Sequence, residues 1–251
     1  MTRTVPERWR KAARFVWAAA IVLVVISLVM VVRVPVERVM GPVQKIVYVH
    51  VPSAIATMIA FGVTFAAGIA YLTTRRWFWD AIGAASAEVG LVFATVVMVT
   101  GPLWARSAWN TWWTWEPRLT TFFILWILYA AYQVIRASLH GTAKRNISAV
   151  LGIIFFVMYP VTVYSVNLWR GSMHPQNVTM VGEMRQTLLF SMLAWAVFYV
   201  AVLERRLRLE WARRAAEMEL GAVGAEAGPA EAAAEGRGRS SRAPGAPGAA
   251  R

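Results

Sequence analysis

Long apolar segments recur along the whole chain, and short polar or charged segments separate them. A helix needs about 20 mostly apolar residues to cross the hydrocarbon core of a bilayer. Six segments come close to this length or exceed it, at about residues 15–32, 51–74, 81–100, 121–135, 148–166 and 187–203. The pattern therefore predicts an all-α, polytopic membrane protein with a six-helix membrane domain, residues 15–203.

The segments outside this domain differ in composition. Residues 1–14 are short and basic. The apolar run that follows is longer than a typical signal-peptide core and precedes no small-residue cleavage site, so we expect it to be retained as the first span. Residues 204–220 are charged and predict a helical extension. Residues 221–251 are rich in Ala, Gly, Pro, Glu and Arg and predict disorder, because they bury too little apolar surface to offset the ordering entropy.

Charge gives the expected orientation. The chain is 58% hydrophobic with a mean hydropathy of +0.50, so its net charge of +13 does not indicate nucleic-acid binding. Basic residues of membrane proteins gather on the cytoplasmic side. Of the 26 Lys and Arg, 19 lie in the two terminal regions and in the loops around residues 75–76 and 136–146. Both termini are therefore predicted to be cytoplasmic, with the lipid bilayer around the six spans.

The segment Gly101–Thr121 (GPLWARSAWNTWWTWEPRLTT) is the most unusual stretch of the chain. It holds five of the thirteen tryptophans: Trp104, Trp109, Trp112, Trp113 and Trp115. Tryptophan favours the membrane–water boundary, so an interfacial belt is one interpretation. A belt usually places one or two aromatic residues at a helix end. Five in twelve residues favour a second interpretation, a surface that stacks on a large flat partner.

Histidine is the most plausible metal ligand, because the chain has no cysteine and only three histidines. The predicted orientation places His50, His174 and the tryptophan-rich segment on the outer face, and His140 alone in a cytoplasmic loop. A heme takes two axial histidines, and its porphyrin stacks on indole rings. Arginines of the same face, Arg106, Arg118 and Arg170, suit its propionates.

Other interpretations of these polar residues stay open. A lone histidine at a helix end is more often a satisfied polar residue than a ligand, and His140 is interpreted in that way. A zinc site explains the histidines less well than a heme site does, because zinc usually needs three or four protein ligands. Glu88 lies inside the third span, where an ionisable residue is a functional candidate. A helix–helix hydrogen bond explains it equally well, so it is left out of the site.

Three segments together resemble the heme exporter protein C (CcmC) family of the WWD-domain heme-handling membrane proteins. The tryptophan-rich segment follows the pattern TG-x-LW-x(3)-WGTWW-x-WDARLT. KIVYVHVPSA around His50 is similar to the family's YxHVP segment, and SVNLWRGSMHPQ around His174 to its SVNWW–LHQ segment. The resemblance covers about residues 45–203. The chain departs from the pattern at Asn110, Glu116 and Pro117, where Gly, Asp and Ala are usual; a glutamate can keep a structural role such as fixing a backbone donor.

The resemblance implies a role in heme transport and cytochrome c-type biogenesis in the bacterial inner (cytoplasmic) membrane. It implies that His50 and His174 are the axial ligands of the iron of heme b, carried as cargo. It also implies an external platform formed by Trp104, Trp109, Trp112, Trp113, Trp115, Glu116 and Arg118. The implied partners are the ATP-binding-cassette pair CcmA and CcmB, the small membrane protein CcmD and the periplasmic heme chaperone CcmE.

No nucleophile or acid–base pair indicates enzyme chemistry, so we expect a protein that holds and presents heme. Two alternatives remain. Cytochrome c synthetase-type proteins share the tryptophan pattern, but they are larger and carry additional histidines within spans. A permease-like assembly subunit without heme would use the aromatic residues only as membrane anchors.

Overall fold

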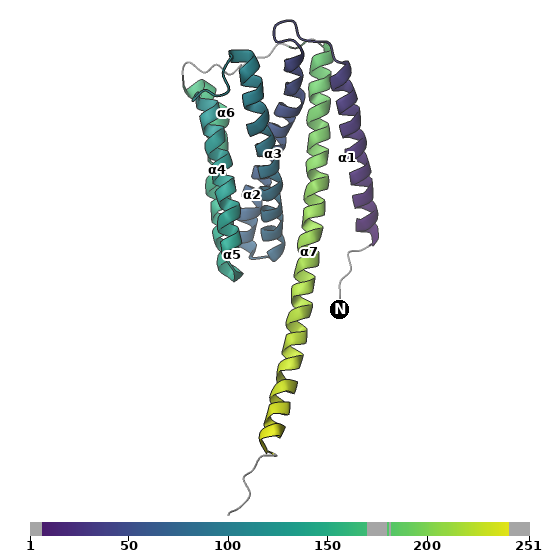
Figure 1. Ribbon diagram of the computed structural model, residues 1–251, viewed down its shortest axis with the longest axis vertical. Helices are drawn as coiled ribbons and strands as arrows, with labels where there is room; N and C mark the ends of the chain where they lie inside the picture. Colours follow the sequence, from purple (N-terminus) through teal and green to yellow (C-terminus); the bar gives the residue numbers. More distant parts are fainter. Residues whose placement is uncertain (1–6, 170–179, 181, 241–251) are drawn as a thin grey trace, which may run out of the picture. The chain divides into compact units, whose positions relative to one another are not determined.

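The computed structural model describes residues 7–169, 180 and 182–240 (Figure 1). Its elements are α1 (Glu7–Arg33), the 3-10 helix η1 (Pro42–Ile46), α2 (Val47–Thr74), α3 (Trp77–Trp109), α4 (Pro117–Ser138), α5 (Gly141–Phe156), α6 (Met158–Leu168) and α7 (Gly182–Ser240). The chain divides into two compact units. Arg3–Leu207 contains the helical bundle, and the C-terminal part from Arg208 is a separate unit.

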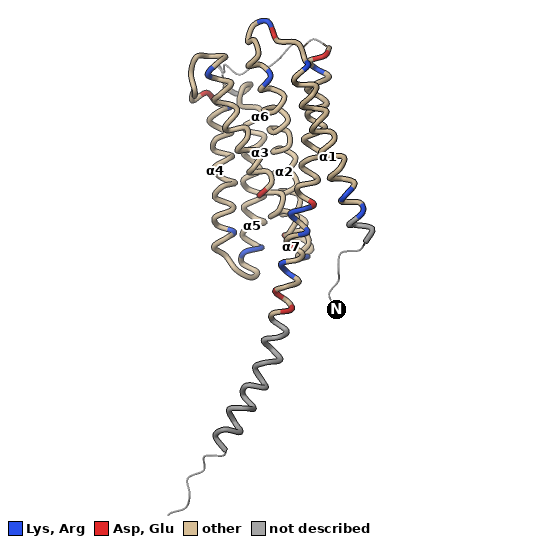
Figure 2. Tube along the Cα trace, turned by 45° about the vertical axis from the view of Figure 1, so that its right-hand side comes forward, with Lys and Arg blue, Asp and Glu red and all other residues tan. Residues whose placement is uncertain are grey.

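Six helical segments in the described part of the chain are long and apolar enough to cross a membrane, which confirms the predicted fold class. The charged residues of the bundle gather toward the helix ends and leave long uncharged stretches between them (Figure 2). α5 and α6 together form one span, residues 141–167. The helix is interrupted at Val157, three residues before Pro160. This interruption lies in the turn before Pro160, whose ring clashes with the preceding helical turn.

Two boundaries of the structure differ from those expected from the sequence. α3 continues to Trp109, so the first half of the segment 101–121 is helical, and only residues 110–116 connect α3 to α4. α7 continues through residues 221–240, where we expected disorder. Alanine and glutamate favour helix in this stretch, whereas its five glycines and Pro229 oppose it. Residues 241–251 lie outside the described residues.

Small residues let α2 and α3 approach closely, as is typical of helix pairs in membranes. Ser86 donates a hydrogen bond of 2.7 Å to the Ala60 carbonyl, and Oγ1 of Thr64 lies 3.3 Å from the Gly83 carbonyl oxygen. A β-carbon placed on Gly90 would lie 2.7 Å from Phe61. Only glycine therefore fits at this crossing, which sets the spacing of the two helices that carry the site described below.

α4 covers the other side of this pair through aromatic residues. The Phe61 ring stacks on Tyr129 with 3.4 Å between centroids, and Tyr132 and Leu125 complete the buried cluster. α1 and α7 pack together through a buried hydrogen bond of 2.8 Å between Ser27 and Ser191.

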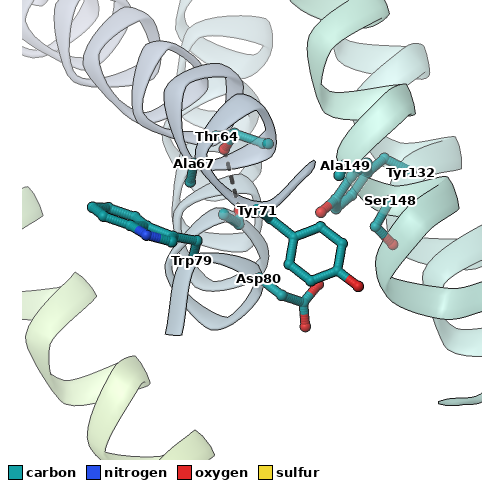
Figure 3. Close-up of a pocket in the computed structure, with 10 residues that line it drawn as sticks. Thr64, Ala67, Tyr71, Trp79, Asp80, Tyr132, Ser148 and Ala149 are labelled. Atoms are coloured by element: carbon teal, nitrogen blue, oxygen red, sulfur yellow. Dashed lines mark hydrogen bonds between the residues drawn. The ribbon is translucent and has the colours of Figure 1, made fainter. Parts of the chain in front are cut away.

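A polar network holds the bundle end at which α2 ends and α3 begins. Arg136 of α4 binds the Asp80 carboxylate of α3 through two nitrogens, at 2.8 and 2.9 Å, and both side chains are largely buried. Tyr71 donates to Asn146 of α5 at 3.1 Å. Asp80, Tyr71 and Tyr132 line a small pocket at this end (Figure 3). The two pairs join α3 to α4 and α2 to α5, and the buried charges of Asp80 and Arg136 compensate each other.

Glu88 also has a partner. Its carboxylate accepts a hydrogen bond of 2.7 Å from Arg206 near the end of the bundle unit. This contact agrees with the helix–helix interpretation of Glu88 and with leaving it out of the candidate site.

Candidate functional site

His50 lies in the first turn of α2, at the bundle end opposite the Asp80 network. Its Nδ1 lies 2.9 Å from Oγ1 of Thr100 on α3, and the ring is half-buried. Cε1 of His50 lies beside Gly101 of α3, where an added β-carbon would make only an ordinary contact at 3.5 Å. The imidazole of His50 therefore extends from α2 and is also fixed by a contact with α3.

Trp104 supports the same ring from α3. The two rings meet edge to face, with centroids 5.7 Å apart and an interplanar angle of 74°. The indole nitrogen of Trp104 donates to the Met40 sulfur at 3.4 Å. Trp104 also packs against the buried cluster that contains Tyr48 and Met184. It is thus a wall of the His50 site and not part of an exposed tryptophan surface.

The turn before η1 brings Met40 to Trp104. The Glu37 carboxylate accepts hydrogen bonds from the backbone N–H groups of Val39, at 2.8 Å, and Met40, at 2.6 Å. Lys45 donates to the Val32 carbonyl at the end of α1, also at 2.8 Å. These bonds give the backbone groups of the loop hydrogen-bond partners within the protein. They also fix the sulfur of Met40 beside the indole of Trp104.

Two capping arrangements shape the connection between α3 and α4, and both explain departures from the family pattern. Asn110 has φ +56°, a left-handed conformation that glycine and asparagine adopt most readily. The Glu116 side chain accepts from the Leu119 N–H at 3.3 Å as the N-cap of α4, and Pro117 occupies the first helical position, which suits proline. The buried acid thus keeps a structural role toward a backbone donor.

The four remaining tryptophans differ in exposure. Trp112 is 57% exposed and Trp115 is 73% exposed, which is unusual for such large apolar rings, whereas Trp109 and Trp113 are half-buried. Trp113 lies edge-on to Trp115 at 5.7 Å and to Phe123 of α4 at 5.9 Å. Trp113 therefore anchors the segment on α4, and its neighbours Trp112 and Trp115 present their rings outward.

Arg118 joins this surface to α6. Its Nη2 donates to the Val163 carbonyl at 2.8 Å, while its Nε is buried without a partner among the described residues. The indole nitrogen of Trp113 and the hydroxyl of Thr114 are also buried and have no hydrogen-bond partner in that part of the chain. These three atoms belong to residues within six positions of the chain, and buried polar atoms without partners are uncommon in folded proteins, so a ligand is one way to satisfy them.

Arg106 lies over the Trp112 ring, with its guanidinium carbon 5.9 Å from the ring centroid. One of its nitrogens donates to the side-chain oxygen of Asn110 at 2.6 Å. A guanidinium has five N–H donors, so this bond leaves further donors for an anionic group.

The structure thus describes two groups of predicted residues, His50 with Trp104, and Trp113 with Trp115 near Glu116 and Arg118. Both lie at the same bundle end, because α2 begins there, α3 ends there and α4 begins there. His174 and Arg170 lie outside the described residues. No group of three potential metal-binding His, Asp or Glu side chains occurs in the part of the chain that the structure describes.

The sequence did not predict two residues that support the His50 site, Thr100 and Met40. Thr100 directly precedes the tryptophan-rich segment, and threonine inside an apolar span is a signal for a polar contact. Met40 carries no comparable signal, because its contact with Trp104 depends on the turn that Glu37 holds.

Comparison with known proteins decides the family. The family model described as heme exporter protein C matches residues 3–221. The chain belongs to the heme exporter protein C family. It is 29% identical to heme exporter protein C of Bradyrhizobium diazoefficiens over 225 residues, 82% of this chain and 86% of that protein. It is 30% identical to heme exporter protein C of Escherichia coli K12 over 179 residues, 70% of this chain and 71% of that protein.

A third relative, heme exporter protein C of Rhodobacter capsulatus, is 27% identical over 184 residues, 70% of this chain and 76% of that protein. Membership of the heme exporter protein C family agrees with the resemblance seen in the tryptophan and histidine segments. Together with the six apolar helices, it makes this chain a multi-pass bacterial membrane protein.

Proposed function

We propose that this member of the heme exporter protein C family holds heme b at the outer face of the bacterial inner membrane and presents it to the periplasmic chaperone CcmE. In this proposal His50 and His174 are the axial ligands, and both termini face the cytoplasm. The heme is cargo. The protein transfers it within an assembly that includes CcmA, CcmB and CcmD.

The observation that carries the proposal is the setting of His50. An imidazole held half-buried at a helix start, with an aromatic wall beside it, is preorganised to bind a metal-centred planar ligand. Exposed rings at the same bundle end supply stacking area, and the arginines and unpartnered buried donors there match the anionic edge of a porphyrin. One ligand accounts for all of these features.

The test is to purify the full-length protein in detergent from a heme-sufficient host, alone and together with CcmE, and to record visible spectra. We expect near-stoichiometric heme with the sharp reduced bands of a low-spin, bis-histidine iron. Absence of heme in both preparations would contradict the proposal and favour a permease-like subunit. Formation of a thioether product with an apocytochrome c peptide would instead favour the cytochrome c synthetase-type alternative.

Removing the outward rings is expected to weaken heme binding without removing the ligands. Trp115→Ala should lower the affinity about three- to tenfold, because an aromatic contact contributes about 0.5–1.5 kcal/mol beyond its buried area. The measurement is a heme titration of heme-depleted protein, followed in the Soret band.

Trp79→Ala is the matched control, since Trp79 lines the pocket at the opposite bundle end. Equal affinity of the wild type and Trp115→Ala would show that Trp115 forms no part of the platform.

A further inference from the structure

The hydroxyl of Thr100 is committed as a donor to its own helix. Its Oγ1 lies 2.7 Å from the Val96 carbonyl oxygen and 3.4 Å from that of Val97. Both carbonyls are acceptors, and a hydroxyl has only one hydrogen to give them. Threonine in an apolar helix forms this type of bond readily, because it satisfies the hydroxyl where no water is available.

The same oxygen lies 2.9 Å from Nδ1 of His50, and this distance fits a hydrogen bond. Since the hydroxyl hydrogen of Thr100 is donated to a carbonyl, Oγ1 can only accept a hydrogen bond from the His50 ring. Nδ1 must then carry the hydrogen and donate it. In a neutral imidazole only one nitrogen is protonated, so the lone pair of the ring is on Nε2.

We propose that Thr100 is a positioning residue that selects the tautomer of His50 whose Nε2 binds the heme iron. The inference rests on the proposed function and adds to it the ligating atom and the group that fixes it. A further contact supports the ring beside this bond, because Trp104 meets it edge to face with centroids 5.7 Å apart.

The choice of a hydroxyl as partner has a chemical consequence. Metal-bound histidines commonly donate their second N–H to a carboxylate or carbonyl, and a carboxylate raises the basicity of the ligand. Thr100 accepts the same hydrogen without a charge. The bond to Thr100 therefore fixes the orientation of His50 without adding the negative charge that a carboxylate partner would bring.

Nitrogen-15 NMR of the heme-free protein tests the tautomer directly. The protein would be labelled with ¹⁵N-histidine and measured at about pH 8.5, where an unperturbed imidazole is neutral. The chain has only three histidines, so His140→Ala and His174→Ala assign the signals. We expect His50 to show a protonated Nδ1 and an unprotonated Nε2. A protonated Nε2 as the major form in the wild type would overturn the inference, whether or not heme binds.

Variants then test the cause. Thr100→Val removes the acceptor while keeping the shape, and it should give a mixture of His50 tautomers. Thr100→Ser keeps the hydroxyl and should restore the wild-type signal. Thr95→Val is the matched control on the same helix, because Thr95 also bonds a carbonyl, that of Leu91, and accepts from an indole N–H, that of Trp126.

Heme-loaded protein gives the second readout. Thr100→Val should dissociate heme about 10- to 100-fold faster and shift the midpoint potential, whereas Thr100→Ser and Thr95→Val should match the wild type. Unchanged tautomer, dissociation rate and potential in Thr100→Val would overturn the inference while leaving the proposed function standing. A wild type that binds no heme would refute the proposed function, and the NMR result would still decide the tautomer. If Thr100→Val fails to fold, the wild-type NMR signal and Thr100→Ser carry the decision.

Discussion

Replacing either His50 or His174 by alanine is expected to lower the heme content of the purified protein about tenfold or more. Any heme that remains should change from a low-spin to a high-spin spectrum. The reason is that each histidine is proposed to fill one axial position, and a vacated position admits water or no ligand. The measurement is the ratio of heme to protein together with the reduced visible spectrum of each variant.

His140→Ala is the control for these variants, since it removes the third histidine of the chain. His140 precedes α5 at the bundle end that contains Asp80 and Arg136, and its backbone carbonyl accepts from Lys144. This variant should keep the wild-type spectrum. Unchanged spectra in both His50→Ala and His174→Ala would refute the ligand assignment and return the tryptophan-rich segment to an interfacial belt.

The fold could be predicted from hydropathy because a bilayer imposes a length and an apolar composition on every span. The ends of α3 and α7 differ from those that hydropathy predicts. α3 includes Trp104 and Trp109 and ends where Asn110 adopts a left-handed conformation. α7 is helical through residues 221–240, where five glycines and Pro229 make the composition a poor predictor of helix.

The candidate site could be predicted only as a list of residue types on one face. That the tryptophans divide between Trp104 beside His50 and the exposed Trp112 and Trp115 depends on where α3 ends, which the composition does not determine. The contact between His50 and Thr100 joins residues fifty positions apart, and it requires the α2–α3 spacing. The cap formed by Glu116 was foreseeable in kind, because Pro117 suits the first position of a helix and a carboxylate before it can accept from a free backbone N–H.

The close spacing of α2 and α3 leads to a second large expected effect, at Gly90. Gly90→Ala should lower the stability of the bundle by about 1–3 kcal/mol, a fall in the unfolding midpoint of roughly 3–10 °C. The new methyl group would lie 2.7 Å from Phe61 and 2.8 Å from Ala60. Phe61 cannot turn aside, because its other face stacks on Tyr129 at 3.4 Å. Thermal unfolding in detergent, followed by the loss of the monodisperse peak, measures the change.

Gly62→Ala separates overpacking from a general intolerance of alanine in α2 and α3. Its methyl group would meet Phe156 at 3.8 Å, an ordinary contact, so stability should stay the same or rise slightly with the better helix propensity of alanine. His50 and Thr100 belong to the same helix pair as Gly90. A Gly90→Ala protein that folds but holds α2 and α3 further apart should therefore also lose heme affinity, whereas Gly62→Ala should keep it. Equal stability and equal affinity in both variants would show that the close α2–α3 contact does not position the site.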